Sequence, residues 1–260
     1  MVGKIIVVTS GKGGVGKTTV TANIGAALTF LGKRVILIDT DTGLRNLDIT
    51  FGIEDVAIYD VINLSDGECD FEKAAIEHEL YKGLYVLPAS QTKTKENLSK
   101  ENFKALCDNL KKRFDYVLID CPAGIEYGFE CALYPSDEAI IVTNPDRAAL
   151  RDADKVAAII EKDFPNIKTT HLIINRLIPE LAKKGFVPGA EEALITVAIK
   201  LLGLIPEDPH VLINAYESRL TVTDRRSLAG KAYKNIARRL EGEDVKLINF
   251  SKKRLFKKKY

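Results

Sequence analysis

A glycine-rich stretch between an apolar run and a helical segment constrains this chain more than any other feature. Residues 4–9 (KIIVVT) lead directly into SGKGGVGKTT, where Gly11, Gly16, Lys17 and Thr18 satisfy the pattern G-x-x-x-x-G-K-[ST]. Between a strand and a helix, this pattern arranges backbone N–H groups around a phosphate at the positive end of the helix. The stretch therefore predicts a nucleotide-binding loop. A plain glycine-rich turn before a helix is the alternative.

The residue types of this loop predict what each position does. The Lys17 ammonium is expected to reach the β- and γ-phosphates of ATP or ADP, and the Thr18 hydroxyl to bind Mg²⁺. Lys12 stands at a position that the general pattern leaves open. The residues expected to contact the nucleotide are Gly11, Lys12, Gly13, Gly14, Val15, Gly16, Lys17, Thr18 and Thr19.

Short apolar runs alternate with helical periodicities along the whole chain. The predicted strands cover residues 4–9, 34–39, 83–87, 116–120, 139–143, 170–175 and 202–205, and the main predicted helices cover 20–31, 97–114, 148–164, 191–202 and 227–240. Most runs are continuously apolar, which is typical of strands covered on both faces. This order predicts an α/β fold with a doubly wound, mostly parallel sheet and helices on both faces. Because no linker divides the chain persuasively, residues 1–245 are expected to form a single domain.

Carboxylates follow two of the predicted strands. Asp39 and Asp41 come at the end of the second strand, which is expected to lie beside the first, and Asp120 ends the fourth. Ligands of doubly wound sheets bind at the carboxyl ends of the strands. Asp120 is expected to hold a Mg²⁺-bound water as a Walker B carboxylate does, Asp41 to orient the attacking water, and Asp39 to support the loop or the water shell of the metal. For Asp39 and Asp41, an Asx-turn with solvated carboxylates is the alternative.

Composition narrows the class of protein further. The four cysteines show neither a C-x-x-C pair nor zinc-type spacing with the three histidines, so reduced thiols in a cytosolic protein are expected. No run approaches the 18 or so apolar residues of a membrane span, and the N-terminus lacks a signal-peptide pattern. The net charge is +2, but the last nine residues hold six Lys or Arg and no acid, which leaves −4 on the rest. This basic tail favours an anionic partner, either a membrane surface or a nucleic acid.

Several stretches together resemble one family. Residues 12–18 (KGGVGKT) match the deviant Walker A signature K-G-G-x-G-K-[ST]. The other matching stretches are residues 39–48 (DTDTGLRNLD), 120–126 (DCPAGIE), 137–145 (DEAIIVTNP), 151–154 (RDAD) and 203–208 (GLIPED). Over almost its whole length the chain therefore resembles the deviant Walker A (ParA/MinD) ATPases, and among them the MinD type. The resemblance implies slow ATP hydrolysis that a partner or a membrane stimulates.

The resemblance also implies roles that the residues alone do not reveal. Lys12 would cross an ATP-bound homodimer to the nucleotide of the partner, and Asp152 would pair with that lysine in another nucleotide state. The adenine-side positions fall on Asn175, Arg176, Pro206, Glu207 and Asp208. The remaining switch or dimer positions fall on Arg45, Asn46, Pro122, Ala123 and Gly124. Without the resemblance, the adenine-side and Asp152 assignments would describe ordinary strand-to-loop transitions.

Partners and cellular place follow from the same resemblance. A MinD-type ATPase binds the inner membrane surface as the ATP dimer, recruits a MinC-like division inhibitor and is released when ATP is hydrolysed. A MinE-like or other topological regulator would control it. The resemblance thus implies a cytoplasmic protein that is peripheral to the inner face of the cell membrane and positions the cell-division site.

Residues 246–260 are predicted to be a basic amphipathic tail that binds anionic lipids. Its membrane-facing candidates are Leu247, Ile248, Phe250, Lys252, Lys253, Arg254, Leu255 and Phe256. At 100° per residue, Ile248, Leu255 and Phe256 fall on one side of a helix, although Lys252 and Lys259 interrupt that side. A short membrane-targeting helix at this place is what the MinD-type resemblance implies. A disordered basic tail is the alternative.

Three other functions remain open at this level. A ParA-type partition ATPase binds DNA through basic surface, and tail lysines would serve that purpose. The interleaved Leu255 and Phe256 favour a membrane instead, so a nucleic-acid partner is not expected. An iron–sulfur carrier ATPase would need cysteines near the switch loops, where Cys121 and Cys131 lie in sequence. A nucleotide-loaded scaffold with negligible turnover is the third alternative.

Overall fold

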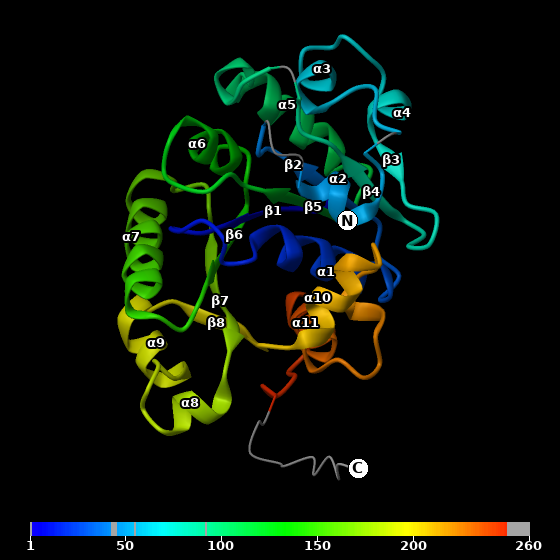
Figure 1. Ribbon diagram of the computed structural model, residues 1–260. Helices are drawn as coiled ribbons and strands as arrows, with labels where there is room; N and C mark the ends of the chain where they lie inside the picture. The colour runs from blue at the N-terminus through cyan, green and yellow to red at the C-terminus, as the bar shows by residue number, and fades with distance from the viewer. Residues whose placement is uncertain (1, 43–45, 55, 92, 249–260) are drawn as a thin grey trace.

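An eight-stranded sheet runs through the middle of the molecule in the order β3-β4-β2-β5-β1-β6-β7-β8 (Figure 1). The computed structural model describes residues 2–42, 46–54, 56–91 and 93–248. The strands are β1 (Lys4–Thr9), β2 (Val35–Asp39), β3 (Ile76–Glu77), β4 (Leu84–Leu87), β5 (Tyr116–Asp120), β6 (Glu138–Thr143), β7 (Thr169–Leu177) and β8 (Lys200–Pro206). All neighbours are parallel except β3 and β4. The carboxyl ends of the parallel strands therefore share one edge of the sheet.

Helices connect the strands and cover both faces of the sheet. They are α1 (Lys17–Thr29), α2 (Asn46–Phe51), α3 (Val61–Ser65), α4 (Phe71–Ala74), α5 (Lys100–Leu110), α6 (Tyr127–Leu133), α7 (Arg147–Asp163), α8 (Pro179–Lys183), α9 (Ala190–Val197), α10 (Pro209–Tyr216) and α11 (Leu228–Leu240), with 3₁₀ turns η1 (Lys95–Asn97) and η2 (Thr221–Thr223). Figure 1 shows α6 and α7 on one side of the sheet and α1 and α11 on the other. This arrangement confirms the predicted doubly wound α/β fold.

Alternate side chains of the central strands feed two separate cores. Ile5 and Val7 of β1 belong to the core that also contains buried side chains of α5, α6, α7 and α9. Ile6 and Val8 of the same strand belong to the core beneath α1 and α11. Successive side chains of a strand point to opposite faces, so a strand covered on both sides must be apolar throughout. This explains why the strand sequences show no polar alternation.

The strand order corrects one expectation. The second strand does not lie beside the first, because β5 is inserted between β1 and β2 and pairs with both. A strand's local sequence does not specify which parallel strand it joins, since every apolar strand offers the same backbone ladder. The acidic strand ends still meet, because Asp120 is the register partner of Asp39 on one side and of Val8 on the other.

The helix predicted over residues 191–202 is wrong in its second half. α9 ends at Val197, where Ala198 adopts a left-handed conformation with φ of 52°, and residues 200–206 form β8 instead. Burial against the neighbouring strand β7 overrides the helical periodicity there. The antiparallel strand β3 and the helices α2, α3, α4, α6, α8 and α10 were not predicted, because elements of two to eight residues carry too little periodicity.

The described structure ends just inside the predicted tail. Residues 246–248 are not helical; Leu247 is exposed, and Ile248 packs partly buried against the core beneath α11. The other tail candidates lie outside the described residues, namely Phe250, Lys252, Lys253, Arg254, Leu255 and Phe256. Throughout the described part of the chain, no helix has the length and apolar character needed to cross a membrane.

Candidate nucleotide-binding site

The glycine-rich loop forms the connection between β1 and α1 at the carboxyl edge of the sheet. Gly16, immediately before α1, has φ of 95°, a left-handed conformation that side chains rarely adopt. A Cβ at Gly16 would also lie 2.5 Å from Asn175 Nδ2. A side chain at Gly11 would meet the Asp152 carbonyl oxygen at 2.5 Å. Both glycines are therefore required by geometry, as the loop pattern predicts.

Asn175, near the end of β7, holds this loop from the opposite side. Its Nδ2 donates a hydrogen bond to the Val15 carbonyl oxygen at 2.8 Å, and the residue is buried. Arg176, the next residue, has φ of 54° and lies where the β7–β8 register is irregular. A bulge of this kind turns a side chain out of the strand alternation. Arg176 is exposed and lines the cavities on both sides of the loop.

Asp120, at the end of β5, faces the first turn of α1. Its Oδ2 accepts a hydrogen bond of 2.6 Å from Thr18 Oγ1, and its Oδ1 accepts one of 3.2 Å from Thr21 Oγ1. Burial raises the pKa of the Asp120 carboxyl to about 6, although both hydroxyls and Lys17 act in the opposite direction. A hydroxyl and a carboxylate beside a phosphate loop are the oxygen donors that Mg²⁺ takes in P-loop proteins. The residues present therefore fit a Mg²⁺-nucleotide.

Asp39 and Asp41, at the end of β2, have different surroundings: Asp39 is buried, and Asp41 lines the cavity. Asp39 is fully buried, and its two oxygens accept hydrogen bonds from the backbone N–H groups of Asp41 at 2.9 Å and Leu47 at 3.1 Å. Burial, followed by the charge of Asp120, raises the Asp39 pKa well above its usual value. Asp41 lines the cavity together with Lys17. Asp39 thus holds the backbone of Asp41 and of the first turn of α2, and Asp41 faces the space next to the phosphate loop.

A cavity of about 430 Å³ opens over the loop. It is lined by Gly13, Gly14, Gly16, Lys17, Thr18, Thr19, Asp41, Asn46, Ile49, Thr50, Ala123 and Arg176. Two of the predicted switch residues, Asn46 and Ala123, are among them, whereas Arg45 lies outside the described residues. Ile49 and Thr50 were missed, because α2 is too short to give a periodic signal in the sequence.

A second, smaller pocket adjoins the first and shares Gly16, Thr19 and Arg176 with it. Its other lining residues are Asn175, Pro206, Glu207, Asp208, Val211, Leu212 and Tyr233. All five residues that the resemblance assigned to the adenine side therefore line one pocket beside the phosphate loop. Val211, Leu212 and Tyr233 were not predicted; they come from α10 and α11, which only tertiary packing brings here. The mixture of apolar walls and polar edges suits a nucleobase.

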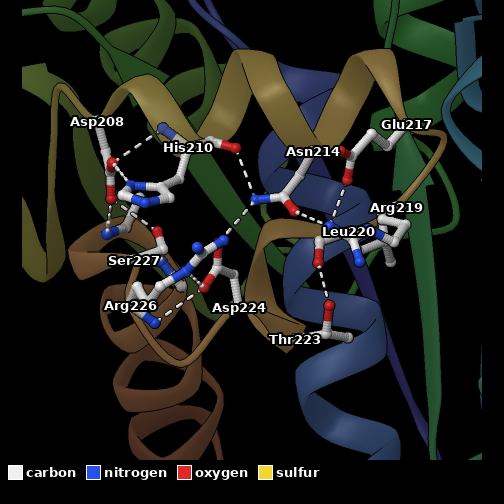
Figure 2. A network of polar contacts seen from close by, with 12 residues as sticks. Asp208, His210, Asn214, Glu217, Arg219, Leu220, Thr223, Asp224, Arg226 and Ser227 are labelled. Atoms are coloured by element: carbon white, nitrogen blue, oxygen red, sulfur yellow. Dashed lines mark hydrogen bonds and ion pairs between the residues drawn. The ribbon is translucent and has the colours of Figure 1, made fainter.

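A hydrogen-bond network supports the wall of this second pocket (Figure 2). Asp208, at the start of α10, accepts hydrogen bonds from Ser227 Oγ at 2.7 Å, the Ala229 N–H at 3.1 Å and the His210 N–H at 3.0 Å. Further along α10, Asn214 is buried, and its Nδ2 donates to the His210 carbonyl oxygen at 2.6 Å and to Asp224 at 3.4 Å. The network ties α10 to the beginning of α11.

Lys12 and Asp152 do not contact one another in this structure. Lys12 Nζ lies 3.9 Å from Asp146 Oδ1, and about half of each side chain is exposed. Asp152 Oδ1 lies 4.0 Å from Lys155 Nζ, one turn along α7. Pro122 and Gly124 flank Ala123 in the loop after β5, where Gly124 has φ of 97°. Of the predicted switch positions that the structure describes, Asn46 and Ala123 line the phosphate cavity, whereas Pro122, Gly124 and Asp152 are not among its lining residues.

The cysteines considered for an iron–sulfur cluster are poorly suited to it. Cys121 and Cys131 are both buried, and burial raises the pKa of the Cys121 thiol to about 12 and also raises that of Cys131. Metals bind the thiolate rather than the thiol. Across the residues with described positions, no three His, Cys, Asp or Glu side chains gather so as to hold a metal ion. Burial thus disfavours the thiolate form that an iron–sulfur cluster requires of Cys121 and Cys131.

Comparison with known proteins agrees with this geometry. Residues 3–173 match the family described as AAA domain. The chain is 46% identical to the septum site-determining protein MinD of Synechocystis sp. over 248 residues, which cover 95% of this chain and 92% of that relative. Among solved structures, the MinC:MinD cell division protein complex of Aquifex aeolicus matches with a TM-score of 0.87 at 38% identity, covering 95% of this chain and 99% of that one. MinD of Pyrococcus horikoshii complexed with Mg-ADP matches with a TM-score of 0.80 at 31% identity, covering 92% and 96%.

Proposed function

The chain belongs to the MinD family of septum site-determining proteins, and on that premise we propose that it is a dimerising switch ATPase that helps to place the division site. The observation that carries the proposal is the pair of adjoining pockets at one sheet edge. One pocket combines the phosphate loop with Asp41 and lies beside the Thr18–Asp120 pair, and the other combines all five expected adenine-side residues. A related protein has been solved with Mg-ADP, which supports the same ligand here.

Each residue of the site has a physical task in ATP hydrolysis. The loop N–H groups and Lys17 would hold the β- and γ-phosphates. Thr18 would hold Mg²⁺ and Asp120 a water bound to it, and the metal, when bound, neutralises the charge of the transferred group. Asp41 would orient the attacking water. Asp39 is committed to backbone N–H groups, so its share in the metal site would be indirect. Asn175 would keep the loop in its phosphate-binding shape.

Lys12 would complete the site of a second copy. Its ion pair with Asp146 is long and half exposed, and surface pairs of this kind contribute about 1 kcal/mol or less. The ammonium can therefore leave Asp146 at little cost and reach a nucleotide across a homodimer. A cation supplied by the partner to the developing phosphoryl charge would make dimerisation a condition of hydrolysis.

The dimer would act at the membrane. Six basic tail residues at about 1 kcal/mol each give at most ~6 kcal/mol near anionic lipid, which corresponds to a dissociation constant of about 40 µM or weaker for one tail. Two tails on one dimer gain an effective-concentration advantage that can reach ~10²–10⁴. A monomer would therefore dissociate from the lipid, whereas an ATP-bound dimer would stay bound to the inner face of the cell membrane. There the dimer would recruit a MinC-like inhibitor, a proposal supported by the similar Aquifex aeolicus protein, which was solved as a MinC:MinD complex. A MinE-like or other topological regulator would control the dimer.

Sedimentation with lipid vesicles tests this proposal. The full chain and a chain ending at Asp244 are spun with phosphatidylglycerol vesicles in the presence of ATP or ADP, and ATPase activity is measured alongside. We expect the full chain to pellet with ATP and to be stimulated by the vesicles, and the shortened chain to do neither. Equal pelleting with ADP and ATP would refute the switch, and salt-sensitive retention on DNA in place of vesicles would point to a partition ATPase.

A further inference from the structure

The chain that leaves α11 is held in a defined shape before the tail begins. Gly242 has φ of 86°, its N–H donates to the Arg239 carbonyl oxygen at 2.9 Å, and the Glu243 N–H donates to the Arg238 carbonyl oxygen at 3.0 Å. These two bonds form a Schellman motif, which ends a helix and reverses the chain. Residues 245–248, which we call the stem, therefore run back along the end of α11.

Arg239 binds this stem with three hydrogen bonds from one guanidinium. Its Nε donates to the Val245 carbonyl oxygen at 2.8 Å, its Nη2 to the Lys246 carbonyl oxygen at 2.9 Å, and its Nη1 to the Leu202 carbonyl oxygen of β8 at 3.0 Å. The rigid fork of an arginine suits several acceptors at once. Ile248 packs partly buried against the core beneath α11. Through these contacts the stem is fastened both to α11 and to the sheet.

Arg238, the preceding residue, offers a natural comparison. Its Nε and Nη2 bond to Glu243 Oε2 at 2.9 and 2.6 Å, and nearly half of each side chain is exposed. The guanidinium of Arg238 is thus directed to a surface carboxylate, whereas that of Arg239 is directed to the backbone of the stem. The two arginines therefore differ in function although they are neighbours on one helix end.

We propose that Arg239 is a positioning residue that fastens residues 245–248 to the ATPase body, so that the chain reaching toward lipid starts no earlier than residue 249. The domain boundary expected at residue 245 then lies after Ile248. The fastening itself rests on the hydrogen bonds of Arg239 and the packing of Ile248, whereas its consequence for membrane binding rests on the proposed function.

The consequence concerns the two tails of a dimer. Tyr233 of α11 lines the second pocket, and Ser227 at the start of α11 bonds to Asp208, so a single helix of 13 residues joins the nucleotide site to the stem. A fixed starting point shortens the tether between body and lipid. Counted up to Lys252, the tether would lengthen from three residues to seven if the stem were released. Effective concentration falls with about the −3/2 power of tether length, so avid binding would weaken roughly three- to fourfold.

Limited proteolysis with trypsin tests the fastening without any lipid. Trypsin cleaves the peptide bond after Lys246, and the carbonyl oxygen of that bond accepts a hydrogen bond from Arg239. We expect the fragment that ends at Lys246 to appear at least ten times faster in Arg239→Met than in the unchanged chain, and Arg238→Met to remain close to the unchanged chain. Mass spectrometry identifies the fragments, and a synthetic peptide of residues 241–252 gives the rate for an unprotected bond. Cleavage of the unchanged chain at the peptide's rate would overturn the proposal.

A second variant and a vesicle measurement complete the test. Arg239→Lys keeps the positive charge but not the three hydrogen bonds of the guanidinium, so trypsin should also cleave this variant faster. If trypsin cleaves both Arg239 variants at the rate of the unchanged chain while their melting temperatures are retained, Arg239 does not hold the stem. With phosphatidylglycerol vesicles and ATP, Arg239→Lys should bind roughly three- to fourfold more weakly. If the unchanged chain fails to bind vesicles, the proposed membrane function fails, while the proteolysis result still decides the role of Arg239.

Discussion

At the scale of single residues, the site depends on side chains that shape the backbone around the phosphates. Asn175 shows this best, because its amide clamps the Val15 carbonyl oxygen while Gly16 leaves room for it. The loop pattern identified Gly16, Lys17 and Thr18 without help from the structure. The clamp could not be predicted from residue types, since Asn175 lies 160 positions away from its acceptor.

We expect Asn175→Ala to weaken ADP binding about tenfold. The substitution removes a buried hydrogen bond and leaves the Val15 carbonyl oxygen unpaired, a loss of about 1–2 kcal/mol, and each 1.4 kcal/mol corresponds to a factor of ten. Titration calorimetry with Mg-ADP measures the effect. Asn166→Ala is the matched control, because Asn166 donates to three carbonyl oxygens at the end of α6 and just after it, away from the pocket. If both variants bind ADP equally well, the clamp has no influence on the nucleotide.

At the scale of elements, α10 and α11 form one wall of the second pocket, to which they contribute Val211, Leu212 and Tyr233. Residues 227–240 were predicted as a helix, and α11 is found there with Ser227 as its N-cap, bonded to the Gly230 N–H at 2.9 Å. α10 was missed, although Asp208 caps it before Pro209. Burial tends to raise the Asp208 pKa, but hydrogen bonds from Ser227, Ala229 and His210 outweigh it and lower the pKa. Asp208 is thus an ionised anchor shared by both helices.

We expect Ser227→Ala to reduce stability and nucleotide affinity together. Loss of an N-cap costs about 1 kcal/mol, and here the Asp208 carboxylate also loses a donor, so α10 is held less firmly. Ser99→Ala removes the N-cap of α5, far from both pockets in the described contacts, and serves as the control. Urea unfolding should show a comparable loss in both variants, but only Ser227→Ala should raise the ATP concentration for half-maximal activity. The same rise in both would mean that the wall is not specifically tied to Asp208.

At the scale of the whole molecule, the sheet gathers most of the predicted site residues at one edge, and Lys12 is not among the residues that line the two pockets there. The carboxyl ends of β1, β2, β5, β7 and β8 contribute the phosphate loop, the three carboxylates of Asp39, Asp41 and Asp120, and the predicted adenine-side residues of the second pocket. Lys12 is half exposed next to that edge and pairs only distantly with Asp146. This arrangement suits a residue that acts on a second copy.

A mixing experiment tests whether Lys12 acts across a dimer. Lys12→Ala and Asp41→Ala should each hydrolyse ATP very slowly when pure. In a mixed dimer, the Lys12→Ala subunit keeps its own Asp41 and receives Lys12 from its partner, so one complete site is restored. We expect the mixture to recover part of the wild-type rate, measured as phosphate release. No recovery, in a mixture shown by native mass spectrometry to contain mixed dimers, would mean that Lys12 acts within its own subunit.

The fold class, the phosphate loop and the acidic strand ends could be predicted from the amino-acid sequence because they depend on local rules: apolar runs form buried strands, and glycines permit the turn around a phosphate. The family resemblance predicted the five adenine-side residues, all of which line the second pocket. Four features became visible only in the folded chain: β5 separates β1 from β2, residues 200–206 are a strand, Asn175 clamps the loop, and Arg239 bonds to the stem. Those features depend on which distant segments pack together, and the free energy of such packing cannot be inferred from any single segment of the sequence.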